Sequence, residues 1–95
     1  MPIDGFNWDD GNWPKCEQHG VSKAAIEWAL STPFTQLPDP HDSVEERFRA
    51  IGNDETGRYL FIVFCIREMD NKTLIRPISA RYMHRKEIEA YERQR

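Results

Sequence analysis

The sequence has no long apolar run and little cysteine, and each shortage excludes a class of protein. No stretch reaches the roughly 18–20 apolar residues with which a helix spans a membrane. Two cysteines are too few for a disulfide scaffold or a thiolate zinc site. A glycine-rich phosphate loop and a Gly-x-Ser-x-Gly nucleophile elbow are also missing. The first residues carry no basic region followed by an apolar one, so we expect a cytoplasmic protein without a secretory signal.

The remaining composition suits one small globular domain. The chain has 95 residues, and its apolar share of 39% is too high for a disordered chain. The aromatic share of 12% supplies large side chains for a modest core. We therefore expect a single domain over residues 1–95.

Acidic and basic residues are unevenly divided along the chain. The net charge is -3, but residues 1–45 hold eight acidic side chains against two lysines. Residues 46–95 hold eleven basic side chains, nine of them arginine, against eight acidic ones. Phosphate binding depends on a local positive patch, so the second half is compatible with a nucleic-acid partner. The alternative is that the arginines only solvate a surface.

Two short helices are predicted in the first half. Apolar residues at helical spacing run from Lys23 to Leu30, and Ser22 in front of them is a typical N-cap. The other predicted helix covers residues 12–19, with Asp9 or Asp10 as its cap and a glycine after it.

Strand patterns dominate the second half. Three strands in series and a short edge strand before the helices are predicted, over residues 45–53, 58–67, 73–79 and 2–8. The strand over residues 58–67 is almost wholly apolar, so we expect a central strand covered on both faces. Pro77 cannot donate a ladder hydrogen bond, so its strand should lie at an edge or carry a bulge.

The last predicted element is a helix over residues 84–94, with Ile88 and Tyr91 on its inner side. Residues 34–37 are expected to be extended at most. The order is thus one strand, two helices, a three-strand antiparallel meander and a helix. Helices packed against one antiparallel sheet make an α+β domain.

Two clusters of polar residues on predicted elements are candidates for chemistry. Lys15 and His19 lie four residues apart and share a face of the first helix. A surface lysine and a histidine that caps the helix end give the same pattern, which alone favours that interpretation. Arg47 and Arg49 project from one strand face, about 7 Å apart. Arginines that merely solvate an exposed face would do the same.

A third cluster lies where the last strand ends and the C-terminal helix begins. It holds Arg76, Ser79, Arg81 and Tyr82. Strand ends and helix N-termini are common anion sites, arginine forks hold phosphate oxygens, and a tyrosine can stack on a base. The competing interpretation is an edge strand kept basic to prevent aggregation.

A metal site has little support in the sequence. Asp39, His41 and Asp42 share a loop between prolines, but no second group of ligands accompanies them. We therefore expect no metal and no cofactor. The three tryptophans, Trp28 among them, are expected to be packing anchors, and Cys65 an inert core residue.

Taken together, these segments resemble the BrnT toxins of bacterial type II toxin–antitoxin systems, from about Phe6 to Tyr91. The most specific parts are the run Ile78-Ser79-Ala80-Arg81, which closes a strand before a basic helix, and the turn His19-Gly20-Val21-Ser22. The other matching residues are Trp8, Asp9, Lys15, Asp39, His41, Glu46, Arg47, Ile51, Gly52, Gly57, Arg58 and Glu87.

The resemblance implies a fold similar to that of RelE-type ribonuclease toxins. It implies cleavage of RNA that halts translation. It also implies a partner, a BrnA-like antitoxin with a ribbon-helix-helix DNA-binding part, and a heterotetramer of toxin and antitoxin.

Metal-free cleavage of RNA uses the substrate's own 2′-hydroxyl, together with a base, an acid and cations that stabilise the phosphorane. On that mechanism His19 is an acid or base and Glu46 the alternative base, while Arg47 and Arg81 stabilise charge. The substrate-binding residues are then Lys15, Arg76, Ser79 and Tyr82.

Two other functions stay open. One is a catalytically degenerate homologue that binds an antitoxin or nucleic acid without cleaving, which two departures from the family pattern suggest, namely Gln18 where lysine is usual and Pro77 where isoleucine is usual. The other is a small DNA-binding regulator, which the arginine-rich second half permits, although no helix-turn-helix or basic recognition helix is evident.

Overall fold

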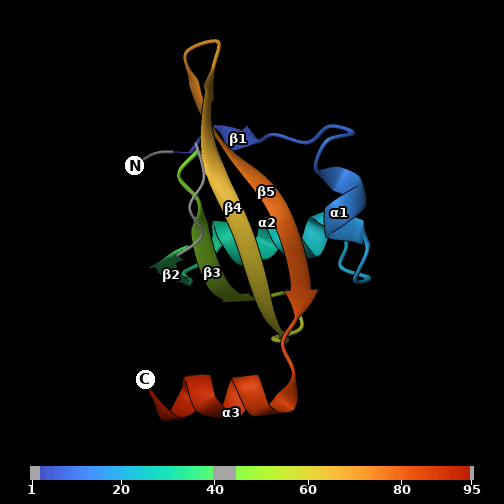
Figure 1. The fold of residues 1–95 in the computed structure, drawn as a ribbon, viewed down its shortest axis with the longest axis vertical. Helices are drawn as coiled ribbons and strands as arrows, with labels where there is room; N and C mark the ends of the chain where they lie inside the picture. Colours follow the sequence, from blue (N-terminus) through green and yellow to red (C-terminus); the bar gives the residue numbers. More distant parts are fainter. Residues whose placement is uncertain (1–2, 40–44, 95) are drawn as a thin grey trace.

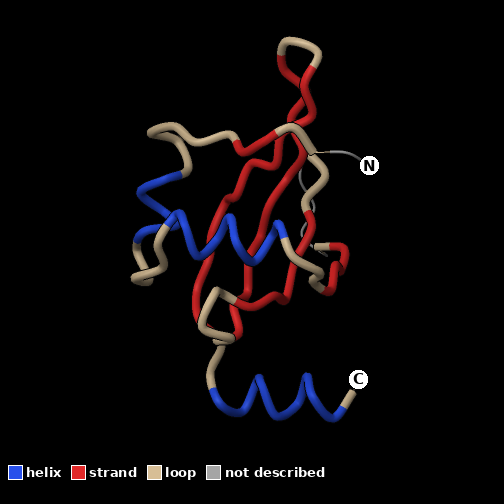
Figure 2. Tube along the Cα trace, turned by 180° about the vertical axis from the view of Figure 1, so that it is seen from behind, coloured by secondary structure: helices blue, strands red, loops and turns tan. Residues whose placement is uncertain are grey.

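The computed structural model describes residues 3–39 and 45–94, in which one sheet is flanked by three helices. The strands are β1 (Gly5–Phe6), β2 (Thr35–Pro38), β3 (Phe48–Asn53), β4 (Tyr59–Met69) and β5 (Lys72–Tyr82). The helices are α1 (Trp13–Glu17), α2 (Lys23–Ser31) and α3 (Arg85–Arg93). Figures 1 and 2 show α2 across one face of the sheet, α1 beside β5, and α3 beyond one end of the long strands. The α+β class is thereby confirmed.

The sheet differs from the predicted one in two strands. Its order is β1-β5-β4-β3-β2, and all pairs are antiparallel except β1 with β5, which run parallel. β1 is only two residues long and no hairpin joins it to β5, so no local turn fixes its direction. Residues 35–38, expected to be extended at most, pair with β3 and form an edge strand. The predicted antiparallel sheet is therefore a mixed, five-stranded one.

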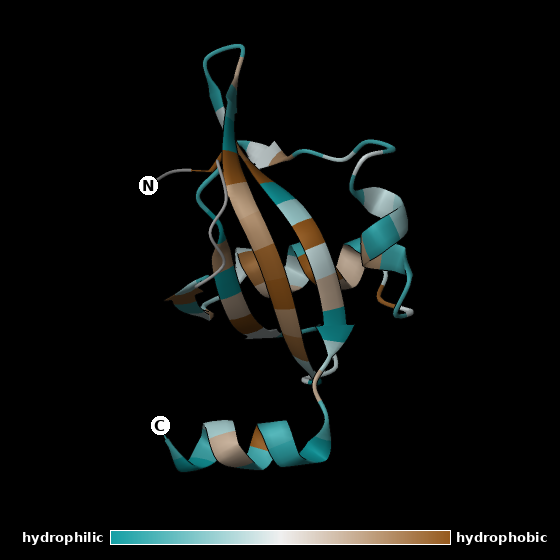
Figure 3. Cartoon of the chain, viewed as in Figure 1, coloured by the Kyte–Doolittle hydropathy of each residue, from teal (hydrophilic) through white to brown (hydrophobic). Residues whose placement is uncertain are grey.

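The three long strands lie near their predicted positions but differ in length. β3 begins at Phe48, and β5 continues to Tyr82. The bulge expected at Pro77 is present, because the register of β4 and β5 shifts between Val63 and Phe64, opposite that proline. β4 is the central strand of the sheet, as predicted. Its residues alternate between half-buried and buried from Tyr59 to Phe64, so one of its faces is only partly covered, where full cover of both was expected. Figure 3 shows that the middle of β4 is apolar and that its end near the turn into β5 is hydrophilic.

The core lies between α2 and the sheet. Buried residues of α2 face buried residues of three strands, namely Ala25, Ile26, Ala29 and Leu30 against Ala50, Leu60, Ile62, Phe64 and Ala80. The hydroxyl of Ser22 accepts a hydrogen bond from the Ala25 N–H at 3.1 Å, which confirms the predicted N-cap. Gly52 allows close approach, because a Cβ there would lie 3.1 Å from the carbonyl oxygen of Ala29.

α1 is shorter than predicted and begins differently. Its N-cap is Asn12, so neither Asp9 nor Asp10 has the expected role. The carbonyl oxygen of Asp9 accepts the N–H groups of Asn12 and Trp13, and this bend delays the start of the helix. Gly20 follows the helix with a φ of 75°, as expected for a residue that ends it.

A buried amide fastens the start of α1 to the sheet. Asn12 is 1% exposed, and its side-chain NH₂ donates to the carbonyl oxygens of Asn7 at 2.9 Å and Pro77 at 2.8 Å. The Pro77 carbonyl at the bulge thereby gains a hydrogen-bond donor, which in a regular strand ladder would be a backbone N–H. Residues 65 positions apart are joined by a single side chain.

Two of the three tryptophans are packing anchors, as predicted. The rings of Trp8 and Trp13 meet edge to face at 5.4 Å between centroids and pack against the core. The Nζ of Lys23 lies 4.8 Å from the Trp13 ring centroid. Trp28 is 50% exposed, so the same prediction is wrong for it.

α3 is the one helix without a fully buried residue among the described residues. The Tyr91 hydroxyl shares a hydrogen bond with the Thr35 hydroxyl, and its ring meets Tyr59 edge to face at 5.8 Å. Ile88, the other expected inner residue, is half-buried. In the described part of the chain, no helix is both long and apolar enough to cross a membrane.

Candidate nucleic-acid interface

Strand register brings polar residues together on the sheet face opposite α2, which we call the outer face. Residues that alternate with the core residues point to this side. One row across three strands is Ile51, Phe61 and Arg81, and the next is Arg49, Val63 and Ser79. Beyond the bulge, Cys65 pairs with Arg76. The sheet thus gathers three arginines on one face from two strands that are distant in sequence.

Two further arginines flank this face. Arg67 follows Cys65 by two residues on β4, and Arg47 directly precedes β3. Glu45 connects them, because it forms an ion pair with Arg67 at 2.8 Å and the charge of Arg47 helps to lower its pKa. Within the described residues, the buried Nε of Arg47 has no hydrogen-bond partner.

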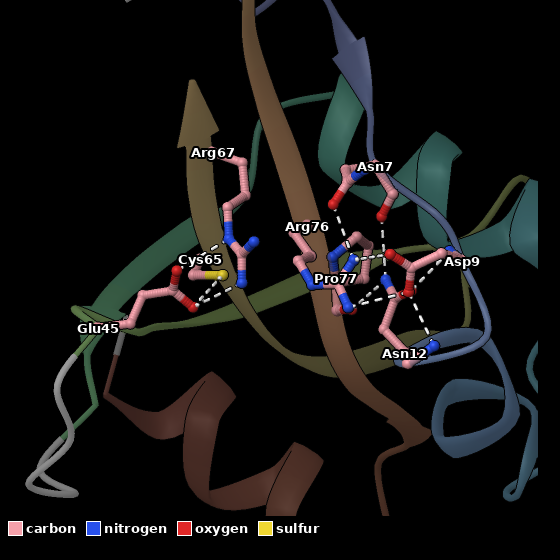
Figure 4. A network of polar contacts seen from close by, with 9 residues as sticks. Asn7, Asp9, Asn12, Glu45, Cys65, Arg67, Arg76 and Pro77 are labelled. Carbon is pink, nitrogen blue, oxygen red and sulfur yellow. Dashed lines mark hydrogen bonds and ion pairs between the residues drawn. The ribbon is translucent and has the colours of Figure 1, made fainter. Parts of the chain in front are cut away.

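Cys65 is buried beneath this ion pair, as predicted. Its Sγ donates to Oε1 of Glu45 at 3.1 Å, which is the main cause of the lowered pKa of Glu45 (Figure 4). Burial raises the pKa of the Cys65 thiol, and the Glu45 carboxylate raises it further. A thiol held in its protonated form is a poor nucleophile.

Arg76 forms hydrogen bonds with the chain segment that leads into α1. Its Nη1 donates to Oδ1 of Asn7 at 2.7 Å, and its guanidinium meets both carboxylate oxygens of Asp9 at 3.0 Å (Figure 4). The hydrogen bond from Arg76 is also the main reason that the pKa of Asp9 is lowered. The Arg76 side chain is only 11% exposed, so these bonds fix it beside Pro77 rather than leave it extended into solvent.

Arg81 is held by a carboxylate of α3. Its two terminal nitrogens donate to the two oxygens of Glu87 at 2.7 and 2.8 Å, a bidentate pair. Arg81 and the His84 N–H together lower the pKa of Glu87 to about 2. The guanidinium carbon lies 5.0 Å from the centroid of the Phe61 ring. Arg81 therefore joins α3, the sheet and an aromatic ring at one point.

Arg49 is the most available cation of the outer face. Its Nε donates to the carbonyl oxygen of Pro38 at 3.3 Å, and no other side-chain hydrogen bond or ion pair of Arg49 exists among the described residues. The terminal nitrogens can therefore accept an anionic partner without breaking an ion pair.

A cavity of about 640 Å³ lies between the outer face and α3. Its lining residues are Thr35, Leu37, Arg49, Ile51 and Phe61 from the sheet, and Met83, Glu87, Ala90, Tyr91 and Gln94 from the C-terminal segment. Arg49 and the helix that follows β5 thus border one cavity.

None of the predicted catalytic and substrate-binding residues lines this cavity, although Arg81 contacts the lining residues Phe61 and Glu87. Lys15 lies on α1 and His19 in the turn after it; both are exposed, and neither makes a side-chain hydrogen bond or ion pair among residues 3–39 and 45–94. Glu46 is exposed next to Arg47. Ser79 lies half-buried on the outer face, beside Val63.

Tyr82 points to the opposite side of β5 from Arg81. Its ring packs against the core, and its hydroxyl donates to Oδ2 of Asp54 at 3.0 Å. The guanidinium of Arg58 covers the ring at 3.6 Å. Alternation along a strand made this outcome unavoidable once Arg81 faced outward. The structure therefore does not bring the predicted base-stacking residue to the outer face.

Phe61 and Glu87 are the outer-face residues to which the sequence had assigned no role. Alternation within the apolar run offered a signal for Phe61, since it lies two residues from Val63 and pairs with Arg81. No local pattern predicts that Glu87 reaches Arg81. His41 and Asp42, from the weak metal candidate, lie outside the described residues.

Comparison with known families identifies the chain. Residues 8–87 match the family described as the ribonuclease toxin BrnT of type II toxin–antitoxin systems. A search of curated proteins finds no match to the chain. The family match spans most of the 95 residues and includes α1, α2, the long strands and the start of α3. The chain therefore belongs to the BrnT family of ribonuclease toxins of type II toxin–antitoxin systems.

Proposed function

We propose that the outer face binds single-stranded RNA and that the chain cleaves it without a metal, which halts translation. The observation that carries this proposal is the register that collects Arg49, Arg76 and Arg81 on one sheet face, beside a cavity. Arginine forks suit phosphate oxygens, and a cluster of them raises the local concentration of a polyanion even when the net charge is -3.

The chemistry balances without a cofactor. A base removes the proton of a 2′-hydroxyl, the 2′-oxygen attacks the adjacent phosphorus, and the bond to the 5′-oxygen breaks as an acid protonates that oxygen. The products are a 2′,3′-cyclic phosphate and a 5′-hydroxyl. Charge builds on the phosphorane, where fixed cations act most strongly. Arg81 and Arg47 are assigned to that charge.

Glu46 is one candidate for the base, because it is exposed and adjoins Arg47 in the sequence. His19, at the end of α1, is the second candidate and has no bond that ties it to the outer face among the described residues. Histidine and glutamate side chains can both act as general bases in proton transfer. Variants Glu46→Gln and His19→Gln separate the two by their pH–rate profiles.

Arg81 provides the decisive test. Induced expression of the wild type should arrest growth and degrade RNA, and Arg81→Ala should lower cleavage by the purified protein by about 10²- to 10³-fold. The matched control is Arg85→Ala, because Arg85 is a 92% exposed arginine of α3 outside the cavity lining. Since Arg81→Ala leaves Glu87 unpaired, the double variant Arg81→Ala with Glu87→Gln should be equally inactive.

Three outcomes would each change the assignment. Normal growth and intact RNA in cells that express soluble wild-type protein would exclude the proposed ribonuclease activity. Full activity in Arg81→Ala would move the site away from the outer face. RNA binding without cleavage would favour the catalytically degenerate homologue, a function consistent with carboxylates that occupy both Arg76 and Arg81.

The family also implies an antitoxin partner. We propose that it is BrnA-like, carries a ribbon-helix-helix part and assembles with the toxin as a heterotetramer in the cytoplasm. Growth arrest should disappear on co-expression with the antitoxin. Light scattering of the purified complex then gives its stoichiometry.

A further inference from the structure

The cavity between α3 and the outer face has the size and lining of a small ligand site. Its volume of about 640 Å³ lies within the roughly 300–1,000 Å³ of typical pockets. Apolar and aromatic side chains form the walls, with Ile51 and Phe61 on the sheet and Ala90 and Tyr91 on α3. Polar groups stand at its borders, as they do in sites that orient a flat ligand.

Phe61 is placed to receive an aromatic ligand. It lies in the middle of the row Ile51–Phe61–Arg81, so its ring is supported from β3 and β5. Arg81 lies 5.0 Å from its centroid, which places a phosphate-binding group next to an aromatic surface. Bases of single strands stack on such side chains while arginines hold the phosphates between them.

The charges at the cavity favour a nucleic acid over an apolar segment of a protein. One cation, Arg49, and one carboxylate, Glu87, line it. Arg81 adds a second cation beside the lining, because it contacts Phe61 and pairs with Glu87. The two oxygens of Glu87 are already bonded by Arg81 and by the His84 N–H, so they repel an incoming anion less than a free carboxylate would. A phosphodiester next to a bound base therefore has Arg49 in the lining and Arg81 beside Phe61 as cationic partners.

We propose that this cavity binds one unpaired nucleobase of the RNA, with Phe61 as its stacking surface, and so selects the nucleotide next to the cleaved bond. The inference rests on the proposed function, since it names a subsite of the same interface. Gln94 supplies an amide at the cavity border that can both donate to and accept from the edge of a base.

The test is an abasic scan. Short 2′-O-methyl RNA strands, which lack the attacking hydroxyl, are made with one base removed at each position in turn, and their binding is measured by fluorescence anisotropy. One position should stand out for the wild type, with affinity about 5- to 150-fold lower when its base is absent. Phe61→Leu should bind the intact strand more weakly by a similar factor and should lose the dependence on that position.

Two further variants control for altered folding. Phe61→Tyr keeps the ring and should retain the dependence. Phe48→Leu makes the same chemical change on the core side, where Phe48 packs on Phe64 at 5.6 Å between centroids, and should leave the abasic profile unchanged. Gln94→Leu should alter which base is preferred at the sensitive position.

The outcomes separate this inference from the proposed function. If RNA binds in a salt-dependent manner but no position couples to Phe61, the base site is wrong and the RNA interface stands. If no RNA binds at all, both fail. If Phe61→Leu leaves RNA binding intact and instead weakens the antitoxin complex, the cavity is a protein docking site and the inference is overturned.

Discussion

The two faces of the sheet are built by different means. On one face, α2 places four buried apolar residues against the strands. On the other, α3 has no fully buried residue and is held by a bidentate ion pair, a shared hydroxyl hydrogen bond and a ring contact. Apolar burial supplies most of the free energy of folding. The α2 face therefore contributes most of the stability of the fold, and the outer face can hold charged residues.

This division has a chemical reason. An arginine row buried under a tightly packed helix would lose its hydration without a compensating partner. A loosely docked helix leaves water and a polyanion access to the same cations. The predictions that follow test this comparison, from the largest expected effect to the smallest.

Truncation of one isoleucine on each helix is the strongest test. Ile26 is fully buried, so Ile26→Ala should lower the free energy of unfolding by about 2–5 kcal/mol. Ile88 on α3 is half-buried, so Ile88→Ala should cost less than about 1 kcal/mol. Urea unfolding followed by circular dichroism measures both. Equal losses would mean that α3 is as much part of the core as α2.

The polar link between α1 and β5 should rank next. Asn12→Ala removes three side-chain hydrogen bonds, from the Asp9 N–H and to the carbonyls of Asn7 and Pro77, and leaves the buried Pro77 carbonyl without this partner, at a cost of about 1–3 kcal/mol. Asn53→Ala is the control, since its amide makes one exposed bond to the Gly57 carbonyl and should cost less. A thermal midpoint that falls equally in both variants would contradict the assigned role of Asn12.

A smaller effect is expected at the start of α2. Ser22→Ala deletes the N-cap and should lower the free energy of unfolding by about 1 kcal/mol. Ser31→Ala, at the exposed C-terminal end of the same helix, should change it by less than about 0.5 kcal/mol. Chemical denaturation of the pair checks the difference, and no difference would mean that burial alone positions α2.

The smallest effect on global stability should come from acid, and it should be confined to α3. The pKa of Glu87 is about 2 in the folded chain against 4.5 ordinarily, so its bonds are fully present above pH 4.5 and are lost as the pH falls toward 2. Amide hydrogen exchange across α3 should accelerate over that range before the core is affected. In Glu87→Gln the acid-dependent step should vanish, whereas Glu89→Gln should keep it.

Several elements could be predicted because their signals are local. Ser22 and the apolar spacing after it defined α2. Pro77 indicated a bulge because a proline cannot donate a ladder hydrogen bond. In each case the determining residues lie within a few positions of the feature.

The errors fall where the determining partner is distant. The parallel pairing of β1 depends on Leu74 and Ile75, about 70 residues away, and a two-residue strand has no periodicity of its own. β2 is a strand only because it pairs with β3. α1 starts late because of the bend at Asp9. Propensity is a weak guide when tertiary contacts decide the outcome.

The candidate site divides in the same way. Alternation alone placed Arg47 and Arg49 together, and cross-strand register then added Arg81 beside Phe61. The sequence does not show which side chains already bind these arginines. That Arg76 is bound by Asp9, Arg81 by Glu87, and Tyr82 by Asp54 follows only from three-dimensional proximity.

The short connection between β5 and α3 has a consequence for any competitor. Only Met83 and His84 separate the two elements, so a detached α3 remains tethered beside its docking surface. Such a tether holds a segment at an effective concentration of about 1 mM or more. A separate molecule present at about 1 μM must therefore bind that surface roughly 1,000-fold more tightly than α3 does to displace it. The short connection thus sets the minimum affinity that any molecule needs to replace α3 on its docking surface.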